Sequence, residues 1–241
     1  MNVIKRNIPN LITCINVLSG CVAIILTFTA DDPVQAVPAW IWASLAIGVA
    51  AVADFLDGFS ARLLKAWSDV GKELDSLSDL VSFGVAPAMI LFSILSEDPG
   101  LPAWLRWCAL IIPALGALRL ARFNVDSRQT TSFIGLPIPA NALFWIGFAA
   151  VFTSFPEWRW LHSVWFILPL IIVEAWLMVS PLPLFSLKFH SYGWKGNENR
   201  WILIAGAVVL LFFFGLQGLV PVILLYLLLS AISLLSAKES K

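Results

Sequence analysis

Six of the chain's 15 carboxylates fall between positions 54 and 79, in the stretch DFLDGFSARLLKAWSDVGKELDSLSD. Only 12% of the 241 residues are charged, so this concentration needs a reason. Asp54 and Asp57 are three positions apart, and Asp75 and Asp79 are four apart. Either spacing places a pair on one face of a helix. We therefore expect four carboxylates to converge where two antiparallel helices meet.

These carboxylates indicate cation chemistry. Close to a low-dielectric region they are costly to bury unless a proton or a cation neutralises them. Hard oxygen ligands suit magnesium, manganese or calcium, so the cluster predicts a divalent-cation site. The alternative is a solvated loop, and this is our interpretation of Asp69 and Glu73, which are out of phase with both pairs. Gly71 lies between the pairs, where we expect a helix to end and the chain to turn back.

Small and basic residues accompany the first pair. Gly58 and Ala61 leave the backbone open to close approach, and Arg62 adds a fixed positive charge suited to phosphate. Phosphoryl chemistry depends largely on positioning and charge neutralisation, which these residue types supply. The stretch therefore predicts a cradle for a ligand that contains a pyrophosphate.

The elements that must position these residues are membrane helices. Hydrophobic residues make up 60% of the chain, well above the roughly 45–50% of soluble domains. Because a crossing needs about 20 apolar residues, we expect an all-α fold, a polytopic transmembrane bundle of about eight spans forming a single domain over residues 1–241. The expected spans are 11–30, 36–57, 78–96, 102–121, 137–154, 163–180, 201–215 and 218–236.

The basic residues indicate the orientation of these spans. If the N-terminus is cytoplasmic and the chain crosses eight times, all but two of the 15 Lys and Arg residues fall on the cytoplasmic side. The exceptions are Arg106 and Arg159. By the positive-inside rule, we expect both termini and the acidic cluster at the cytoplasmic face of the membrane.

The acidic stretch resembles the signature of the CDP-alcohol phosphotransferase family, with every fixed position filled. The matching pattern is Asp54-x-x-Asp57-Gly58-x-x-Ala61-Arg62, eight residues, then Gly71-x-x-x-Asp75-x-x-x-Asp79. The resemblance implies that one or two divalent ions, Mg²⁺ or Mn²⁺, are bound by Asp54, Asp57, Asp75 and Asp79. It implies that Asp79 is the general base acting on the acceptor alcohol. The residues implied to contact the CDP group are Gly58, Ala61, Arg62, Gly71 and also Ser68, which stands six positions after the arginine.

Stretches outside the motif are similar to the membrane-integral phosphatidylserine synthases of bacteria and archaea. They are 8–20, 117–125, 133–142 and 177–189, so the resemblance covers most of residues 8–190, whereas spans 201–236 look generic. It implies transfer of a phosphatidyl group from CDP-diacylglycerol to L-serine, with release of CMP. It also implies an integral protein of a bacterial or archaeal membrane, a homodimer like many relatives. We expect no nucleic-acid partner.

Polar residues at the start of the first span are further candidates. Asn10, Thr13 and Asn16 are spaced three apart on one face. Such side chains commonly form hydrogen bonds with neighbouring membrane helices. The resemblance adds a nucleotide-contact role for Asn10 and Thr13.

Two arginines lie at the cytoplasmic end of the fourth span. Arg119 and Arg122 share a face, and Asn124 follows them. They either bind the diphosphate or the carboxylate of serine, or they anchor the helix at the membrane interface. Glu174, inside span 163–180, is a lone intramembrane carboxylate for which the sequence indicates no partner.

Three alternatives remain beside the main interpretation. The same family includes enzymes that use glycerol 3-phosphate or an inositol compound, and a phosphorylated acceptor would need a basic pocket such as Arg119, Arg122 and Arg128 offer. A protein that binds CDP-lipid without catalysis is disfavoured by the complete motif. A secondary transporter would use acidic residues for ion coupling, but transporter sites usually lie near the bilayer midplane between internal repeats. This cluster lies at one face, and no repeat is evident.

Overall fold

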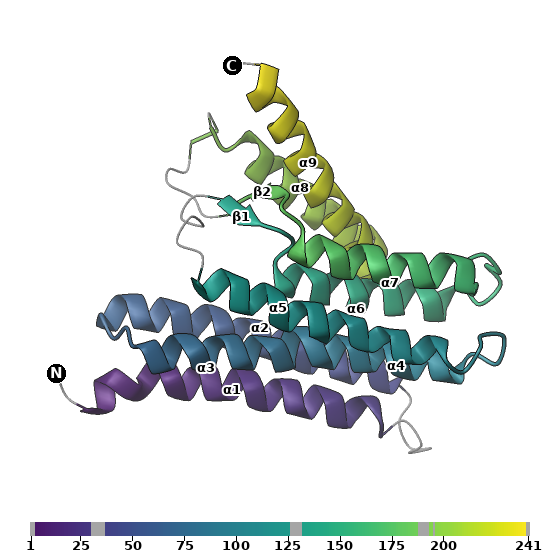
Figure 1. Ribbon diagram of the computed structural model, residues 1–241, viewed down its shortest axis with the longest axis horizontal. Coiled ribbons are helices and arrows are strands. Elements are labelled where there is room, and N and C mark those ends of the chain that lie inside the picture. The colour runs from purple at the N-terminus through teal and green to yellow at the C-terminus, as the bar shows by residue number, and fades with distance from the viewer. Residues whose placement is uncertain (1–2, 30–36, 126–131, 188–192, 195, 240–241) are drawn as a thin grey trace.

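The computed structural model describes residues 3–29, 37–125, 132–187, 193–194 and 196–239 (Figure 1). Its α-helices are α1 Val3–Thr27, α2 Ala39–Leu64, α3 Asp69–Asp79, α4 Ala86–Glu97, α5 Ile111–Val125, α6 Ile138–Ser154, α7 Val164–Val179, α8 Glu198–Phe214 and α9 Leu219–Glu239. Two three-residue strands, β1 Ser132–Ile134 and β2 Pro183–Phe185, pair antiparallel. The all-α prediction is confirmed, and this short ladder is an addition that the sequence did not indicate.

Several helices are long and apolar enough to cross a membrane, so the chain is an α-helical membrane protein. Five stretches meet that description: Asn7–Thr27, Ala39–Leu64, Asp69–Glu97, Leu105–Val125 and Glu198–Leu235. The last is two helices, because the 3-10 turn η3 (Gly215–Gly218) separates α8 from α9. The apolar helices α6 and α7 are shorter, at 17 and 16 residues. The count of eight crossings and the cytoplasmic termini stay predictions.

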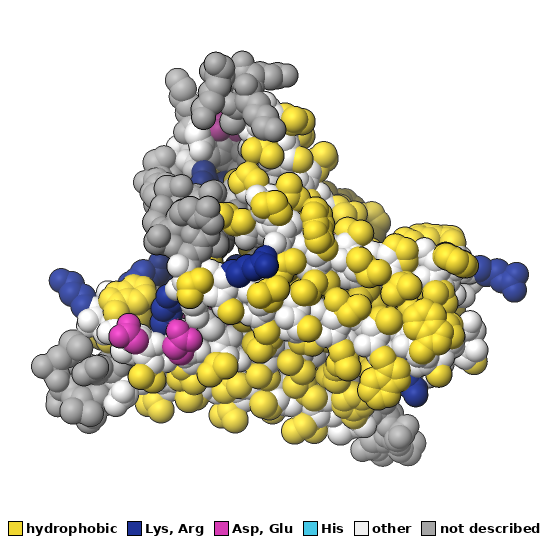
Figure 2. Space-filling view, in the orientation of Figure 1, with side chains coloured by type: hydrophobic (Ala, Val, Ile, Leu, Met, Phe, Trp, Pro, Cys, Tyr) yellow, Lys and Arg dark blue, Asp and Glu magenta, His cyan; other side chains and the backbone are white. Residues whose placement is uncertain are grey.

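The first seven helices run roughly alongside one another, whereas α8 and α9 cross them at a steep angle (Figure 1). Helix α6 is central, and its Trp145 is only 1% exposed. Hydrophobic side chains cover much of the visible outer surface, as expected for helices that face lipid (Figure 2). The bundle is therefore apolar both inside and outside, which leaves its ends as the places for charge.

The connection between α2 and α3 differs from the sequence-based expectation. Helix α2 continues to Leu64, and the chain turns over the next four residues, 65–68. Lys65 adopts the left-handed conformation (φ 51°) that usually favours glycine, and the side chain of Ser68 accepts a hydrogen bond from the backbone N–H of Gly71. The prediction that the helix ends and turns at Gly71 is therefore wrong, because this cap starts α3 before the glycine.

The third apolar stretch is one continuous rod with a local change of helix type. Between α3 and α4 lies a π-helical segment, η1, from Leu80 to Val85. The backbone N–H of Ala86 bonds to the carbonyl of Val81, five residues back. This wider turn begins directly after Asp79, and segments of this kind are frequent at functional sites.

Candidate metal centre

Three carboxylates from two helices meet at one point. Asp54 and Asp57 come from α2 and Asp75 comes from α3, and one oxygen of each lies within 4.8 Å of the other two. Asp57 is only 6% exposed, and Asp54 and Asp75 are half-buried. The Oδ1 atom of Asp75 is buried and has no hydrogen-bond partner among the described residues. An acceptor left without a donor among converging carboxylates fits the oxygen coordination of a divalent cation.

Asp79 lies one turn beyond Asp75 and stands apart from this three-carboxylate group. The Nδ2 of Asn16 donates to its Oδ1 at 3.3 Å. Asp79 also lies close enough to Asp54, Asp75 and Arg119 to interact electrostatically with them. The structure therefore brings three of the four predicted ligands together and gives Asp79 a different environment, which suits a separate chemical role.

Helix α1 holds two of these carboxylates by its polar face. The Oγ1 of Thr13 lies 2.6 Å from Oδ2 of Asp57 and 3.0 Å from the carbonyl oxygen of Pro9. Asn16 reaches Asp79 from the next turn of the same helix. The sequence indicated one polar face on α1, but the pairing of Asn16 with Asp79 was not predicted. The spacing of three residues indicated that these polar side chains share a face of α1, but which residue Asn16 meets depends on how α1 packs against the other helices.

A pocket of about 730 Å³ opens beside the three-carboxylate group. Its lining includes most of the residues predicted to bind substrate, namely Asn10, Thr13, Gly58, Ala61, Ser68 and Gly71. A Cβ added at Gly58 would meet no atom within 4 Å, so this glycine leaves open space that a ligand can use. At Gly71 the added Cβ would lie 2.9 Å from Oδ1 of Asn10, so this glycine allows α1 to approach α3. A pocket of this size accommodates a small-molecule headgroup.

The basic residues around the pocket differ from the expectation. Arg62 is exposed and donates its Nε–H to the carbonyl of Gly58 on its own helix, at 2.9 Å, and it is not among the lining residues. Its phosphate contact stays a prediction. Lys72 does line the pocket, and its Nζ donates to the carbonyl of Asn124 at 2.8 Å. Sequence reasoning gave Lys72 no role, because nothing in the local pattern distinguishes it from the other interfacial lysines.

The two arginines of α5 diverge. Arg119 is 8% exposed, its guanidinium lies 5.3 Å from the centre of the Phe123 ring, and it interacts electrostatically with Asp79. Arg122 is exposed and donates to the carbonyl of Val179 on α7 at 3.2 Å. Only Arg119 therefore faces the aspartates.

The other polar candidates have simpler surroundings. The side chain of Asn124 donates to Oγ of Ser76 at 2.9 Å and so ties α5 to α3. Glu174 is buried on α7 at 3% exposure, and its Oε2 has no hydrogen-bond partner in the described part of the chain. Asp69 and Glu73 are exposed, as predicted for solvated charges, although Asp69 lies at the rim of the pocket. Arg128 lies outside the described residues.

The chain matches a known protein family over most of its length. A family model described as CDP-alcohol phosphatidyltransferase matches residues 6–229. The match includes α8 and part of α9, the region in which the sequence analysis found only generic spans.

Relatives named CDP-diacylglycerol–serine O-phosphatidyltransferase occur in distant organisms. The protein from Mycobacterium tuberculosis is 34% identical over 210 residues, covering 83% of this chain and 68% of the relative. The protein from Methanocaldococcus jannaschii is 38% identical over 148 residues, covering 61% and 63% of the two chains. The protein from Bacillus subtilis is 37% identical over 152 residues, covering 61% and 76%.

Proposed function

The chain belongs to the CDP-alcohol phosphatidyltransferase family, and we propose that it transfers the phosphatidyl group of CDP-diacylglycerol to the hydroxyl of L-serine, releasing CMP. The proposal of this acceptor is supported by the names of the relatives, which all specify serine. The observation that carries the reaction type is the meeting of three carboxylates beside a pocket lined by Gly58 and Ala61.

We propose that Asp54, Asp57 and Asp75 hold one or two divalent cations, Mg²⁺ or Mn²⁺, against the diphosphate of the lipid substrate. A bound cation of this kind supplies charge neutralisation for the phosphoryl group and for the leaving CMP. The backbone at Gly58 and Ala61 lets the nucleotide end approach α2, while Asn10, Thr13, Ser68 and Gly71 shape the opposite wall. Arg62, whose Nε–H is engaged by the carbonyl of Gly58, is proposed to contact the diphosphate through its terminal amino groups.

Asp79 is proposed as the general base. The Asn16 amide occupies Oδ1 of Asp79, which leaves the second oxygen to accept the proton of the serine hydroxyl. The hydroxyl oxygen then forms a bond to the β-phosphorus, the one that carries the diacylglycerol. The bond from that phosphorus to the bridging oxygen breaks, and CMP leaves with the electron pair. Asp79 returns its proton to solvent after product release.

Arg119 is the residue we propose to orient the acceptor. Its guanidinium interacts electrostatically with Asp79 and lies 5.3 Å from the centre of the Phe123 ring. A serine whose carboxylate pairs with Arg119 would direct its hydroxyl toward Asp79. Arg122, engaged on α7, and Asn124, engaged on α3, would support α5 rather than touch the acceptor.

CMP release tests this function. Purified protein is incubated with CDP-diacylglycerol, Mn²⁺ or Mg²⁺, and one of L-serine, glycerol 3-phosphate or an inositol compound. We expect CMP release with serine and divalent cation only. Release with a different alcohol would reassign the acceptor within the family, and absence of release with any alcohol would contradict the proposed activity.

A further inference from the structure

Helix α1 and the π-helical segment η1 are in unusually close contact at Gly20 and Ser82. A Cβ added at Gly20 would lie 2.8 Å from Cα of Ser82 and 3.0 Å from its Cβ, and closer still to its Oγ. Contacts with backbone atoms at such distances cannot be relieved by a side-chain rotation. Only glycine at position 20 therefore lets the two helices keep this separation.

The same line of contact carries hydrogen bonds to α1. The Oγ of Ser82 donates to the carbonyl of Asn16 at 2.9 Å, and the Oγ of Ser78 donates to the carbonyl of Thr13 at 3.3 Å. Both serines are 0% exposed and lie four residues apart, on one face of the rod. Thr13 and Asn16, whose side chains contact Asp57 and Asp79, therefore also accept hydrogen bonds from these two serines through their backbone carbonyls.

We propose that Gly20 and Ser82 are positioning residues for the general base. Their contact fixes the axial position of Asn16 relative to the continuous helix formed by α3, η1 and α4. The Asn16 amide then holds the Asp79 carboxylate in the orientation needed to accept the proton of the acceptor hydroxyl. This inference rests on the proposed function, and it adds two residues that belong neither to the carboxylate group nor to the lining of the pocket.

The effect of this contact falls on Asp79 more than on the metal ligands. Gly20 is four residues from Asn16, about 6 Å along the helix, and seven from Thr13, about 10 Å. Thr13 is also held separately, through its carbonyl by Ser78. A displacement at Gly20 therefore moves Asn16 first, and the step to be affected is proton removal rather than lipid or cation binding.

The test is Gly20→Ala in the purified full chain, assayed by CMP release. We expect kcat to fall about a hundredfold, because a displacement near 1 Å at a reacting group has that effect. The KM for CDP-diacylglycerol and the Mn²⁺ midpoint should stay within about twofold of wild type, since uniform binding is unaffected. Gly48→Ala is the matched control. It makes the same change in a membrane helix, and its added Cβ would meet no atom within 4 Å.

Ser82→Ala tests the same contact without adding an atom, so it gives the answer even if Gly20→Ala cannot be purified. Loss of one hydrogen bond to Asn16 should lower kcat about fivefold, again without a change in KM or metal midpoint. Ser96→Ala is its control, because that exposed hydroxyl bonds, within the described part of the chain, only the carbonyl of Phe92 on its own helix.

Equal kcat values in the variants and their controls would overturn the inference, and so would a parallel loss of lipid or metal binding. The proposed function is judged separately, on the wild-type chain. Turnover with an alcohol other than serine overturns the acceptor and leaves the variant comparison in force. Absence of turnover with every alcohol overturns both.

Discussion

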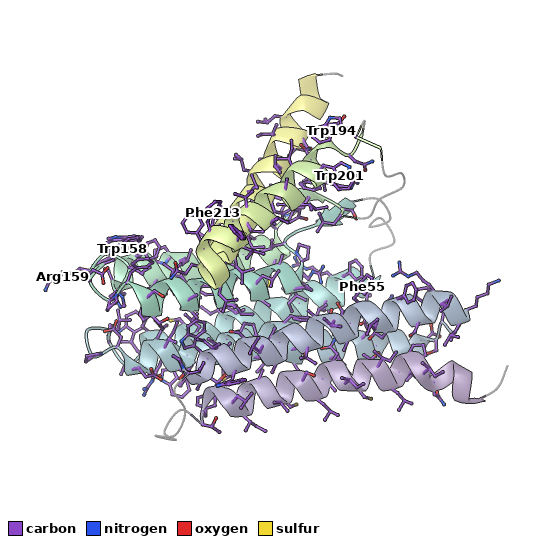
Figure 3. All side chains as sticks on the ribbon, turned by 180° about the vertical axis from the view of Figure 1, so that it is seen from behind. Phe55, Trp158, Arg159, Trp194, Trp201 and Phe213 are labelled. Atoms are coloured by element: carbon purple, nitrogen blue, oxygen red, sulfur yellow. The ribbon has the colours of Figure 1, made fainter. Side chains whose placement is uncertain are left out.

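Two pockets at opposite ends of the helix bundle both contain carboxylates, and they differ in how those carboxylates are satisfied. The aspartate pocket, lined by Asp57, Asp75 and their neighbours, has a volume of about 730 Å³. The His162 pocket, lined by Asp98, His162 and the ends of α4 and α6, has about 610 Å³. Trp158 and Arg159 mark the end with the His162 pocket, and Phe55 on α2 lies toward the other (Figure 3).

The carboxylate of the His162 pocket has partners from its own chain. Oδ2 of Asp98 lies 2.6 Å from Nδ1 of His162, and Oδ1 accepts the backbone N–H of Gly100 at 2.8 Å. In the aspartate pocket, three carboxylates face one another, and Asp75 keeps a buried oxygen without a donor in the described chain. The carboxylate of Asp98 joins two loops, whereas the three facing carboxylates still need a proton or a cation to neutralise them. Similar volume and residue types therefore do not imply similar function.

The largest expected effect is that of Asp57→Ala. Asp57 is the most buried of the three proposed cation ligands, and the substitution removes its carboxylate. We expect CMP release to fall by about a thousandfold or more, because metal assistance is worth several kcal/mol. The measurements are a Mn²⁺ titration of activity and the binding of CDP-diacylglycerol, and we expect the affinity for both to fall.

Glu73→Gln is the matched control for that prediction, since it neutralises an exposed carboxylate on α3 outside the cluster. It should leave the titration unchanged. An unchanged metal titration in Asp57→Ala itself would remove Asp57 from the cation shell and would abolish the contrast between the two pockets.

Asp79→Asn is expected to separate chemistry from binding. An amide of the same shape keeps contact with Asn16 but cannot accept the hydroxyl proton, so turnover should fall at least about a hundredfold. Binding of CDP-diacylglycerol, measured by titration with the purified variant, should remain close to wild type. If Asp79→Asn retained about a tenth or more of the wild-type rate, Asp79 would not be the base.

The sequence predicted the convergence of Asp54, Asp57 and Asp75 because helix periodicity and a short connection determine it locally. The family motif then indicated which residues surround the pocket. It did not reveal where α2 ends, because Lys65 takes a conformation that is uncommon for a residue with a side chain.

Contacts between distant segments were also beyond the sequence. Asn16 meets Asp79 across 63 positions, and Lys72 meets Asn124 across 52. Such pairs depend on how complete helices pack, and no local pattern encodes that packing. The π-helical segment after Asp79 was likewise not predicted from the sequence.

A smaller effect is expected from Thr13→Val, which removes one hydroxyl and preserves the shape of the side chain. Without the contact at 2.6 Å, Asp57 loses the group that orients it toward its fellow ligands. Groups that orient metal ligands typically contribute tenfold or more to affinity, so we expect the Mn²⁺ midpoint to rise about tenfold. Thr27→Val on the same helix is the control, because among the described residues that buried hydroxyl bonds only the carbonyl of Ala23. Equal midpoints in the two variants would mean that α1 does not orient Asp57.

The smallest effect on activity is expected at the other end of the bundle, from His162→Ala. The pair with Asp98 is partly exposed, at 17% and 14% for the two side chains, and such pairs contribute about 1 kcal/mol or less to stability. The centre of the imidazole ring also lies 4.1 Å from the centre of the Phe152 ring, so the substitution removes a packing contact as well. Thermal unfolding should occur about 3 °C lower, while CMP release stays within about twofold of wild type. His162→Phe, which keeps a ring against Phe152, should recover part of that loss. If His162→Ala instead lowered CMP release as much as Thr13→Val, the two ends of the bundle would be functionally coupled, and the His162 pocket would belong to the catalytic cycle rather than to the scaffold.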